Sequence, residues 1–159
     1  MNGYTILHYA CMTNQVDVLN KIINMDDIDI NAQTYDGYTP LMIACIECNE
    51  YIIEQLLKRN DIDVNLQDED GDTALHIACK IGNDNIVKLL INRYDINVNL
   101  QDKYGDTPLH IACRYDYKNI ALILLKNETT LFDIRNNKNK LPLEYKYDLI
   151  IWLYNKMNE

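Results

Sequence analysis

Histidine and cysteine recur at a fixed spacing in this chain, and both side chains can bind a metal or take part in catalysis. A cysteine follows a histidine by three positions in the pairs His8/Cys11, His76/Cys79 and His110/Cys113. On a helix this spacing puts both side chains on one face, which supplies half of a tetrahedral zinc site. A catalytic cysteine would instead need an exposed thiol with a lowered pKa. The surrounding sequence decides between these uses and a structural one.

Each His/Cys pair lies inside a segment that recurs along the chain. The segment Thr5-Ile6-Leu7-His8-Tyr9-Ala10-Cys11 returns with its first residue at Thr39, Thr73 and Thr107, a constant step of 34. The second copy has Met42 in place of histidine. Equivalent helices of stacked units lie ~8–10 Å apart, too far to share a metal with bonds of ~2.0–2.3 Å. We therefore interpret the pairs as part of the fold and predict neither a metal nor a cofactor.

The recurring segment has the features of a short helix. Threonine is an N-cap, because its hydroxyl accepts a hydrogen bond from a free N–H at the helix start. Proline in the next position already has the φ angle of a first helical turn. Leucine and alanine three apart form an apolar stripe, and the small Ala-Cys pair lets a neighbouring helix approach. A turn with positive φ is predicted two residues before each cap, at Gly3, Gly37, Gly71, Gly105 and, in a worn fifth copy, Asn139.

A second helix follows in each copy, and an extended stretch such as Ile62-Asp63-Val64-Asn65 follows that helix. The loops between the two helices contain Asn14, Cys48, Gly82 and Asp116 at one equivalent position. Glycine suits a left-handed helix end and Asn or Asp tolerates one, whereas cysteine predicts a distorted loop. The predicted second helices are Val16–Asn24, Asn49–Lys58, Asn83–Asn92 and Lys118–Lys126.

The repeated pattern resembles the ankyrin-repeat family. The Thr-Pro-Leu-His-x-Ala segment and the Asp-Val-Asn stretch are the signature of that family, and four phased copies cover essentially the whole chain. The resemblance implies an all-α repeat solenoid, in which helix-turn-helix units stack and are joined by β-hairpin-like loops. It also implies that each histidine bonds to threonine or to backbone. We predict one domain, 1–159, with repeats at 3–36, 37–70, 71–104 and 105–138 and a capping repeat at 139–159.

Two details qualify the resemblance. The period of 34 exceeds the usual ~33, which predicts a slightly longer loop after the second helix. Leu141-Pro142-Leu143-Glu144-Tyr145 also resembles the opening of an F-box, which some viral ankyrin proteins carry in truncated form at their C-termini. Because Pro142 lies on the 34-residue register, we favour a cap with its apolar face inward and Lys, Asp and Asn outside. Asn31, Asn65 and Asn99 match positions that can be hydroxylated in the family, although a hairpin hydrogen bond is their ordinary role.

Composition restricts the function further. The net charge is -9, and residues 1–80 contain 4 basic and 14 acidic residues against 11 and 10 in the remainder. An acidic first half repels duplex nucleic acid and attracts a basic partner. No apolar run approaches the ~20 residues of a membrane span, and the N-terminus lacks the features of a signal peptide. With an odd number of cysteines, this predicts a cytoplasmic or nuclear protein with reduced thiols. Known enzyme motifs are missing, so we predict no enzyme.

The resemblance leaves one surface for function, because partners of ankyrin proteins usually bind the hairpin tips and the inner surface of the first helices. Tyrosine and arginine there are frequent binding hot spots. We predict a monomeric module that binds another protein with a basic or apolar surface. Two alternatives stay open: an inhibitor or host-factor mimic of a kinase or transcription factor, and a structural segment of a longer array. The predicted tip residues are Tyr4, Tyr35, Asp36, Tyr38, Glu69, Asp70, Asp72, Lys103, Tyr104, Asp106 and Lys138, and the helix residues are Met12, Ile46, Glu47, Lys80, Ile81, Arg114 and Tyr115.

Overall fold

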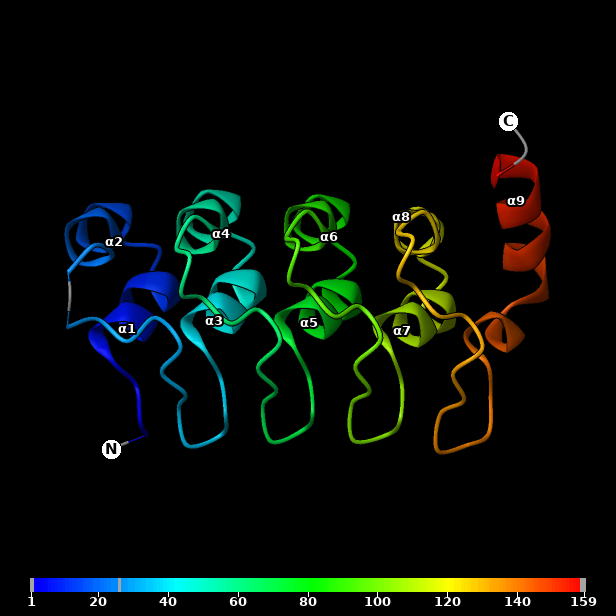
Figure 1. The fold of residues 1–159 in the computed structure, drawn as a ribbon, viewed down its shortest axis with the longest axis horizontal. Coiled ribbons are helices and arrows are strands. Elements are labelled where there is room, and N and C mark those ends of the chain that lie inside the picture. The colour runs from blue at the N-terminus through cyan, green and yellow to red at the C-terminus, as the bar shows by residue number, and fades with distance from the viewer. Residues whose placement is uncertain (1, 26, 158–159) are drawn as a thin grey trace.

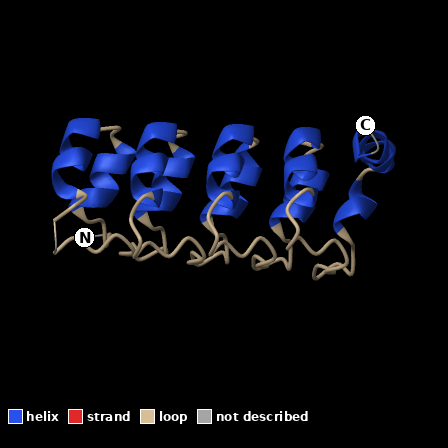
Figure 2. Ribbon diagram, turned by 45° about the horizontal axis from the view of Figure 1, so that its top comes forward, coloured by secondary structure: helices blue, strands red, loops and turns tan. Residues whose placement is uncertain are grey.

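The computed structural model describes residues 2–25 and 27–157, apart from the side chains of residues 147, 149, 154 and 157. Within that part the chain is an all-α repeat solenoid, as predicted, with pairs of short helices in a row and loops along one edge (Figures 1 and 2). The first helices of the pairs are α1 (Ile6–Met12), α3 (Pro40–Ile46), α5 (Ala74–Ile81) and α7 (Pro108–Arg114). The second helices are α2 (Val16–Ile22), α4 (Glu50–Leu57), α6 (Asp84–Ile91) and α8 (Lys118–Leu125), one or two residues shorter than predicted. None of the described helices is long and apolar enough for a membrane span.

Reciprocal hydrogen bonds start the first helices. In α5 the hydroxyl of Thr73 accepts from the backbone N–H of His76 at 3.3 Å, and the Nδ1 atom of His76 accepts from the N–H of Thr73 at 3.2 Å. Because Nδ1 accepts, the ring proton is on Nε2, which donates to the carbonyl of Asp106 in the next repeat at 3.1 Å. His8 and His110 make the same contacts. The structural role implied for the histidines is confirmed, and it includes a bond to the following repeat.

The loops between paired helices share one left-handed backbone conformation. Asn14, Cys48 and Asp116 have φ angles of 55°, 54° and 61°, and Gly82 has 80°. The predicted distortion at Cys48 is therefore wrong, since the thiol points to solvent and the backbone follows the same path as in the other repeats. The hairpin glycines have the predicted positive φ. At Gly37 a Cβ atom would also lie 2.7 Å from the Cα atom of Asp68 in the next hairpin, so no other residue fits without displacement.

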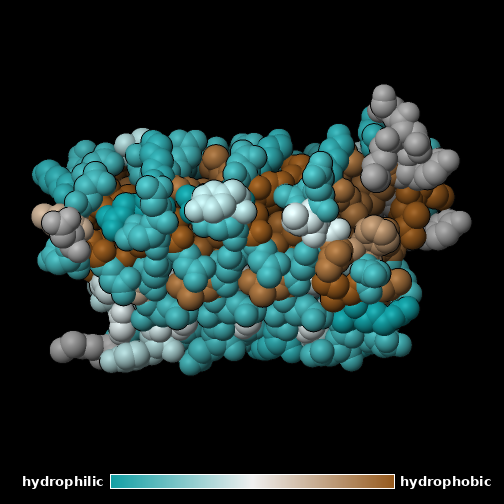
Figure 3. Space-filling view, viewed as in Figure 1, coloured by the Kyte–Doolittle hydropathy of each residue, from teal (hydrophilic) through white to brown (hydrophobic). Residues whose placement is uncertain are grey.

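Stacking of the repeats produces one continuous core. Leucine, isoleucine, alanine and cysteine side chains of all four helix pairs belong to it, and first helices pack on first helices and second on second. Cys11, Cys45, Cys79 and Cys113 are completely buried, and burial raises the pKa of the Cys11 thiol to about 12. These thiols are therefore protonated packing groups at neutral pH. Figure 3 shows the apolar band along the helices and hydrophilic residues along the hairpin edge.

Asparagines in the loops after the second helices connect neighbouring repeats. The Nδ2 atom of Asn31 donates to the carbonyl of Asp61 at 2.7 Å, and its Oδ1 accepts from the N–H of Asp63 at 2.8 Å. Asn65 and Asn99 make the equivalent pairs of bonds. Both ends of each amide are therefore used between repeats, which confirms a hydrogen-bonding role and extends it beyond the residue's own hairpin.

The fifth copy is shortened. Its first helix is one 3-10 turn, η1 (Pro142–Tyr145), packed against α7, and α9 (Tyr147–Met157) packs against α8. A helix in register with α8 would begin at residue 152, so α9 starts five residues early, and it runs across the direction of the other helices (Figure 1). The packing of η1 on α7 supports the cap interpretation. The outer face is only partly polar, however, because Ile150 and Ile151 are 37% and 49% exposed.

Candidate functional site: the hairpin and first-helix face

The predicted binding face consists of the hairpin tips and the C-terminal ends of the first helices, and we call it the concave face. Its composition changes along the stack at two equivalent positions. The residue before the capping threonine is Tyr4, Tyr38, Asp72 and Asp106 in successive repeats, and the residue eight positions later is Met12, Ile46, Lys80 and Arg114. Repeats one and two thus have tyrosine with an aliphatic side chain, whereas repeats three and four have aspartate with a cation.

In the first half, apolar and aromatic side chains are exposed on this face. Tyr35 is 71% exposed, Ile46 42% and Met12 37%. The rings of Tyr4 and Tyr9 lie 5.6 Å apart, and these two residues line a hollow that also reaches Met12. Large aromatic and aliphatic groups in solvent are the groups that gain most from burial against a partner.

In the second half, the equivalent aspartates are buried. Asp106 is 1% exposed, its Oδ2 atom lies 2.6 Å from Nη2 of Arg114, and its Oδ1 accepts from Nδ2 of Asn136 at 2.6 Å. Asp72 is 5% exposed and forms an ion pair with Lys80. The expectation that Asp72 and Asp106 are exposed tip residues is therefore wrong. Each carboxylate directly precedes the threonine cap of its own first helix and pairs with a cation eight residues further on, Lys80 or Arg114.

The other predicted residues remain accessible to different degrees. Lys103 pairs with Asp70 of the preceding repeat at 2.5 Å, and its ammonium lies 5.0 Å from the ring centroid of Tyr104. Much of the acidic charge expected on this face is therefore neutralised within the domain. Tyr4, Tyr38, Lys80 and Arg114 are half-buried. The exposed residues are Met12, Tyr35, Asp36, Ile46, Glu47, Glu69, Asp70, Ile81, Lys103, Tyr104, Tyr115 and Lys138.

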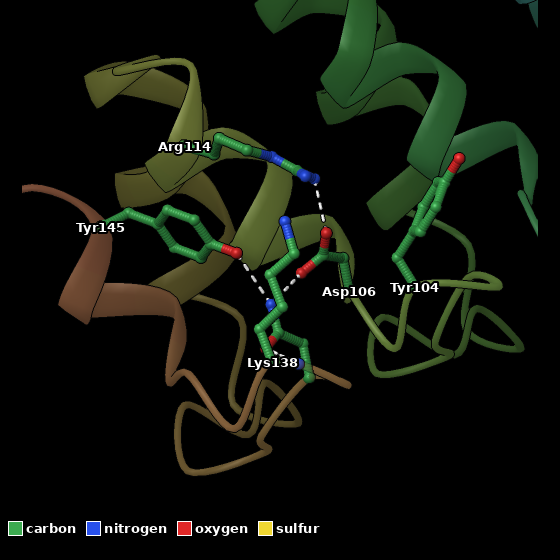
Figure 4. Close-up of a pocket in the computed structure, with 6 residues that line it drawn as sticks. Tyr104, Asp106, Arg114, Lys138 and Tyr145 are labelled. Atoms are coloured by element: carbon green, nitrogen blue, oxygen red, sulfur yellow. Dashed lines mark hydrogen bonds and ion pairs between the residues drawn. The ribbon is translucent and has the colours of Figure 1, made fainter.

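A hollow of about 320 Å³ lies where repeat four meets the cap (Figure 4). The guanidinium of Arg114 stands 5.7 Å from the ring centroids of both Tyr115 and Tyr145, and Asn136 donates to the hydroxyl of Tyr145 at 2.8 Å. Sequence reasoning missed Asn136 and Tyr145. Asn136 could have been found, because it lies one period after Asp102, but nothing in the register indicates Tyr145. The hollow is lined by Tyr104, Asp106, Arg114, Asn136, Lys138 and Tyr145.

A difference in hydrogen bonding separates this junction from the preceding one. The Oδ1 atom of Asp72 and the Oδ2 atom of Asp102 are buried without a hydrogen-bond partner. Burial raises the pKa of the Asp72 carboxyl, and the charge of Asp102 raises it further, against the lowering effect of Lys80. Asp102 occupies the position that Asn136 has in the next repeat. The carboxylate of Asp102 cannot donate a hydrogen bond to Asp72 in the way that the amide of Asn136 donates to Asp106.

The His/Cys pairs are not arranged for catalysis. Burial lowers the pKa of His76 to about 4, and it lowers the pKa values of His8 and His110 as well, so these imidazoles are neutral at pH 7. Burial raises the pKa of the paired Cys79 and Cys113 thiols. In the described part of the chain, no three His, Cys, Asp or Glu side chains gather as ligands for a metal ion.

Comparison with known sequences agrees with the geometry. The family model for ankyrin repeats (3 copies) matches residues 1–68 and 49–138. The chain belongs to the ankyrin-repeat family. Ankyrin repeats are generally non-catalytic modules for protein–protein interaction, and this ankyrin domain has the helix pairs, caps and hairpins of such a module. No curated protein sequence matches the chain.

Proposed function

We propose that this ankyrin domain binds one partner protein through its concave face and that the apolar surface of the first two repeats supplies most of the contact. The observation that carries the proposal is the change along the stack. Positions filled by Asp/cation pairs in repeats three and four hold tyrosine, methionine and isoleucine in repeats one and two, and these side chains lie exposed or half-buried there. Apolar groups that are open to solvent on a family binding face favour association.

The charges on the same face contribute more to specificity for the partner than to the affinity of the complex. Asp36, Glu47 and Glu69 are exposed on the first half, whereas Asp70 is paired with Lys103. Exposed carboxylates attract a basic surface toward the face and speed association, and this attraction weakens as the salt concentration rises. The partner we propose is therefore a protein with an apolar patch bordered by basic residues, bound by a monomeric domain in the cytoplasm or nucleus.

The test is affinity capture from a lysate of the source cells, with the captured proteins identified by mass spectrometry. The triple variant Met12→Ala, Tyr35→Ala, Ile46→Ala should lose the partner without a change in melting temperature, since all three side chains are exposed. A matched control changes exposed tyrosines outside this face, Tyr51→Ala and Tyr94→Ala, which are 44% and 90% exposed. Capture by the triple variant at the wild-type level would show that the surface is wrong.

The same experiment separates the alternatives. An inhibitor or mimic would capture one kinase or transcription factor in stoichiometric amount. A structural segment without a ligand of its own would capture nothing that distinguishes the triple variant from the tyrosine control.

A further inference from the structure

The hollow between repeat four and the cap is surrounded by positive charge. Arg114 and Lys138 line it, and the ammonium of Lys140 lies 5.2 Å from the ring of Tyr145, which forms one of its walls. Lys138 and Lys140 are exposed. By contrast, Lys103 nearby is already paired with Asp70. Lys138 and Lys140 therefore face solvent beside Arg114, whose charge is balanced by Asp106.

The acid inside the hollow is fully occupied. The side chain of Asp106 is 2% exposed, and its two oxygens bond to Asn136 and Arg114. It holds the guanidinium in position, with Nε of Arg114 buried and without a hydrogen-bond partner, while a third of the side chain is exposed at the hollow. Arginine has five N–H donors in a rigid fork that matches a carboxylate.

The positive charge is confined to this junction, because the residues 34 positions earlier carry mainly negative charge. There the equivalent residues are Asp70, Asp72, Lys80, Asp102 and Tyr104, so that three carboxylates stand beside two lysines, Lys80 and the Lys103 that pairs with Asp70. In the hollow, the corresponding residues are Tyr104, Asp106, Arg114, Asn136 and Lys138. An acidic group would be repelled at the earlier junction and attracted at this one.

Two tyrosines add apolar walls. Tyr104 is 54% exposed on one side, and the ring of Tyr145 lies against Arg114 on the other (Figure 4). Aromatic surfaces around a guanidinium hold its plane and exclude water, which strengthens a bond to a carboxylate.

We propose that this hollow is a subsite for an Asp or Glu side chain of the partner protein, next to an apolar residue that contacts Tyr104. The proposal rests on the proposed function, because it gives the second half of the concave face its own share of the partner. The partner would then present its basic and apolar surface to repeats one and two and an acidic residue to the end of the stack.

The probe is a library of random 12-residue peptides displayed on phage and selected against the whole domain. We expect enriched peptides to contain Asp or Glu beside an aromatic or aliphatic residue. A synthetic peptide from the selection should lose about ten-fold in affinity when its acidic residue becomes the amide, corresponding to about 1.4 kcal/mol. Lys138→Glu in the domain should cause a similar loss, whereas Lys126→Glu, the same change of charge on an exposed residue after α8, should not.

Each outcome decides the question. Equal binding of the acidic and amide peptides, or equal effects of Lys138→Glu and Lys126→Glu, overturns the subsite. If such peptides still lose binding to the Met12/Tyr35/Ile46 variant, the proposed function stands without the subsite. If selection enriches no peptide, the subsite is overturned, and the capture experiment with the Met12/Tyr35/Ile46 variant decides the proposed function by itself.

Discussion

Two successive junctions of the stack, between repeats three and four and between repeats four and five, each contain a buried aspartate at the equivalent position. The neighbours of these two aspartates differ. Asp106 bonds to Arg114 and to the amide of Asn136. Asp72 bonds to Lys80 and has Asp102 at the place of the asparagine. The two places are equivalent in detail, because Oδ1 of Asp102 and Oδ1 of Asn136 each accept two backbone N–H bonds from their own hairpins.

The two junctions therefore differ in one side-chain group, which is an amide nitrogen in Asn136 and a carboxylate oxygen in Asp102. Nδ2 of Asn136 donates to Asp106, whereas Oδ2 of Asp102 has nothing to donate, and it is left unpartnered together with Oδ1 of Asp72. The repeat accommodates either residue without a change of backbone. At this buried position the two backbone bonds to Oδ1 are kept in both repeats, while the bond to the neighbouring aspartate exists only with asparagine.

The largest effect on stability is expected from breaking the ion pair between Asp106 and Arg114. Arg114→Ala leaves Asp106 buried without its cation and should lower the free energy of unfolding by about 3 kcal/mol, measured by urea denaturation. The double variant Arg114→Ala, Asp106→Asn should recover part of that loss, because no charge remains to be buried. A loss below about 1 kcal/mol for the single variant would mean that the ion pair does not hold this junction.

Asn136→Asp should make the fourth junction resemble the third. It removes the donor to Asp106 and places two carboxylates together, so we expect a loss of about 1–3 kcal/mol at pH 7. Asn137→Asp in the same hairpin is a suitable control, because Asn137 is exposed and makes no bond to Asp106. Equal effects of the two variants would contradict the role assigned to Asn136.

Asp102→Asn is the reverse change and should stabilise the domain by about 1 kcal/mol at pH 7, since Nδ2 can donate to Asp72. The gain should shrink in acid. The pKa of Asp72 is raised in the folded state, so stability from its protonation is present at low pH and is lost as the pH rises through that pKa. Melting temperatures of both proteins between pH 4 and 7 test this, and a gain that does not depend on pH would contradict it.

The junction between repeats two and three offers the smallest test. Met42 replaces the histidine there, and its sulfur accepts only from the N–H of Thr39 at 3.4 Å. In the other repeats the Nε2 atom donates to the next hairpin, at Tyr38, Asp106 and Lys140. Met42→His should add a bond to the carbonyl of Asp72 and raise stability by about 0.5–1.5 kcal/mol. If stability falls instead, methionine packing outweighs that bond.

Much of the fold could be predicted because its determinants repeat. Threonine caps, hairpin glycines and the left-handed loops at Asn14, Gly82 and Asp116 each follow from local residue types at a 34-residue step, whereas Cys48 adopts the same loop although its residue type does not favour it. The shape of the fifth copy could not be predicted, because the register stops before α9 begins.

The candidate site was predicted less completely. The sequence places Asp72 and Asp106 at hairpin tips, but the structure buries both beside the cation of their own first helix. The spacing of eight between each aspartate and its cation is visible in the sequence, yet it indicates a contact only once the course of the chain from hairpin to helix is known. Tyr145 reaches the hollow through η1, which no repeat pattern describes.

The hydrogen bonds between repeats have a consequence for how the two ends of the stack communicate. The bonds of the histidines and of the loop asparagines join residues 30 to 32 positions apart, which means that each repeat is tied to its immediate neighbours. In such a stack a structural change at α1 reaches α7 only through every repeat between them. A partner that contacts Tyr35 and Arg114 together would link the two ends directly and make the whole stack more rigid. Its binding should then slow amide hydrogen exchange in repeat three, which it touches least, as well as in the repeats that it contacts directly.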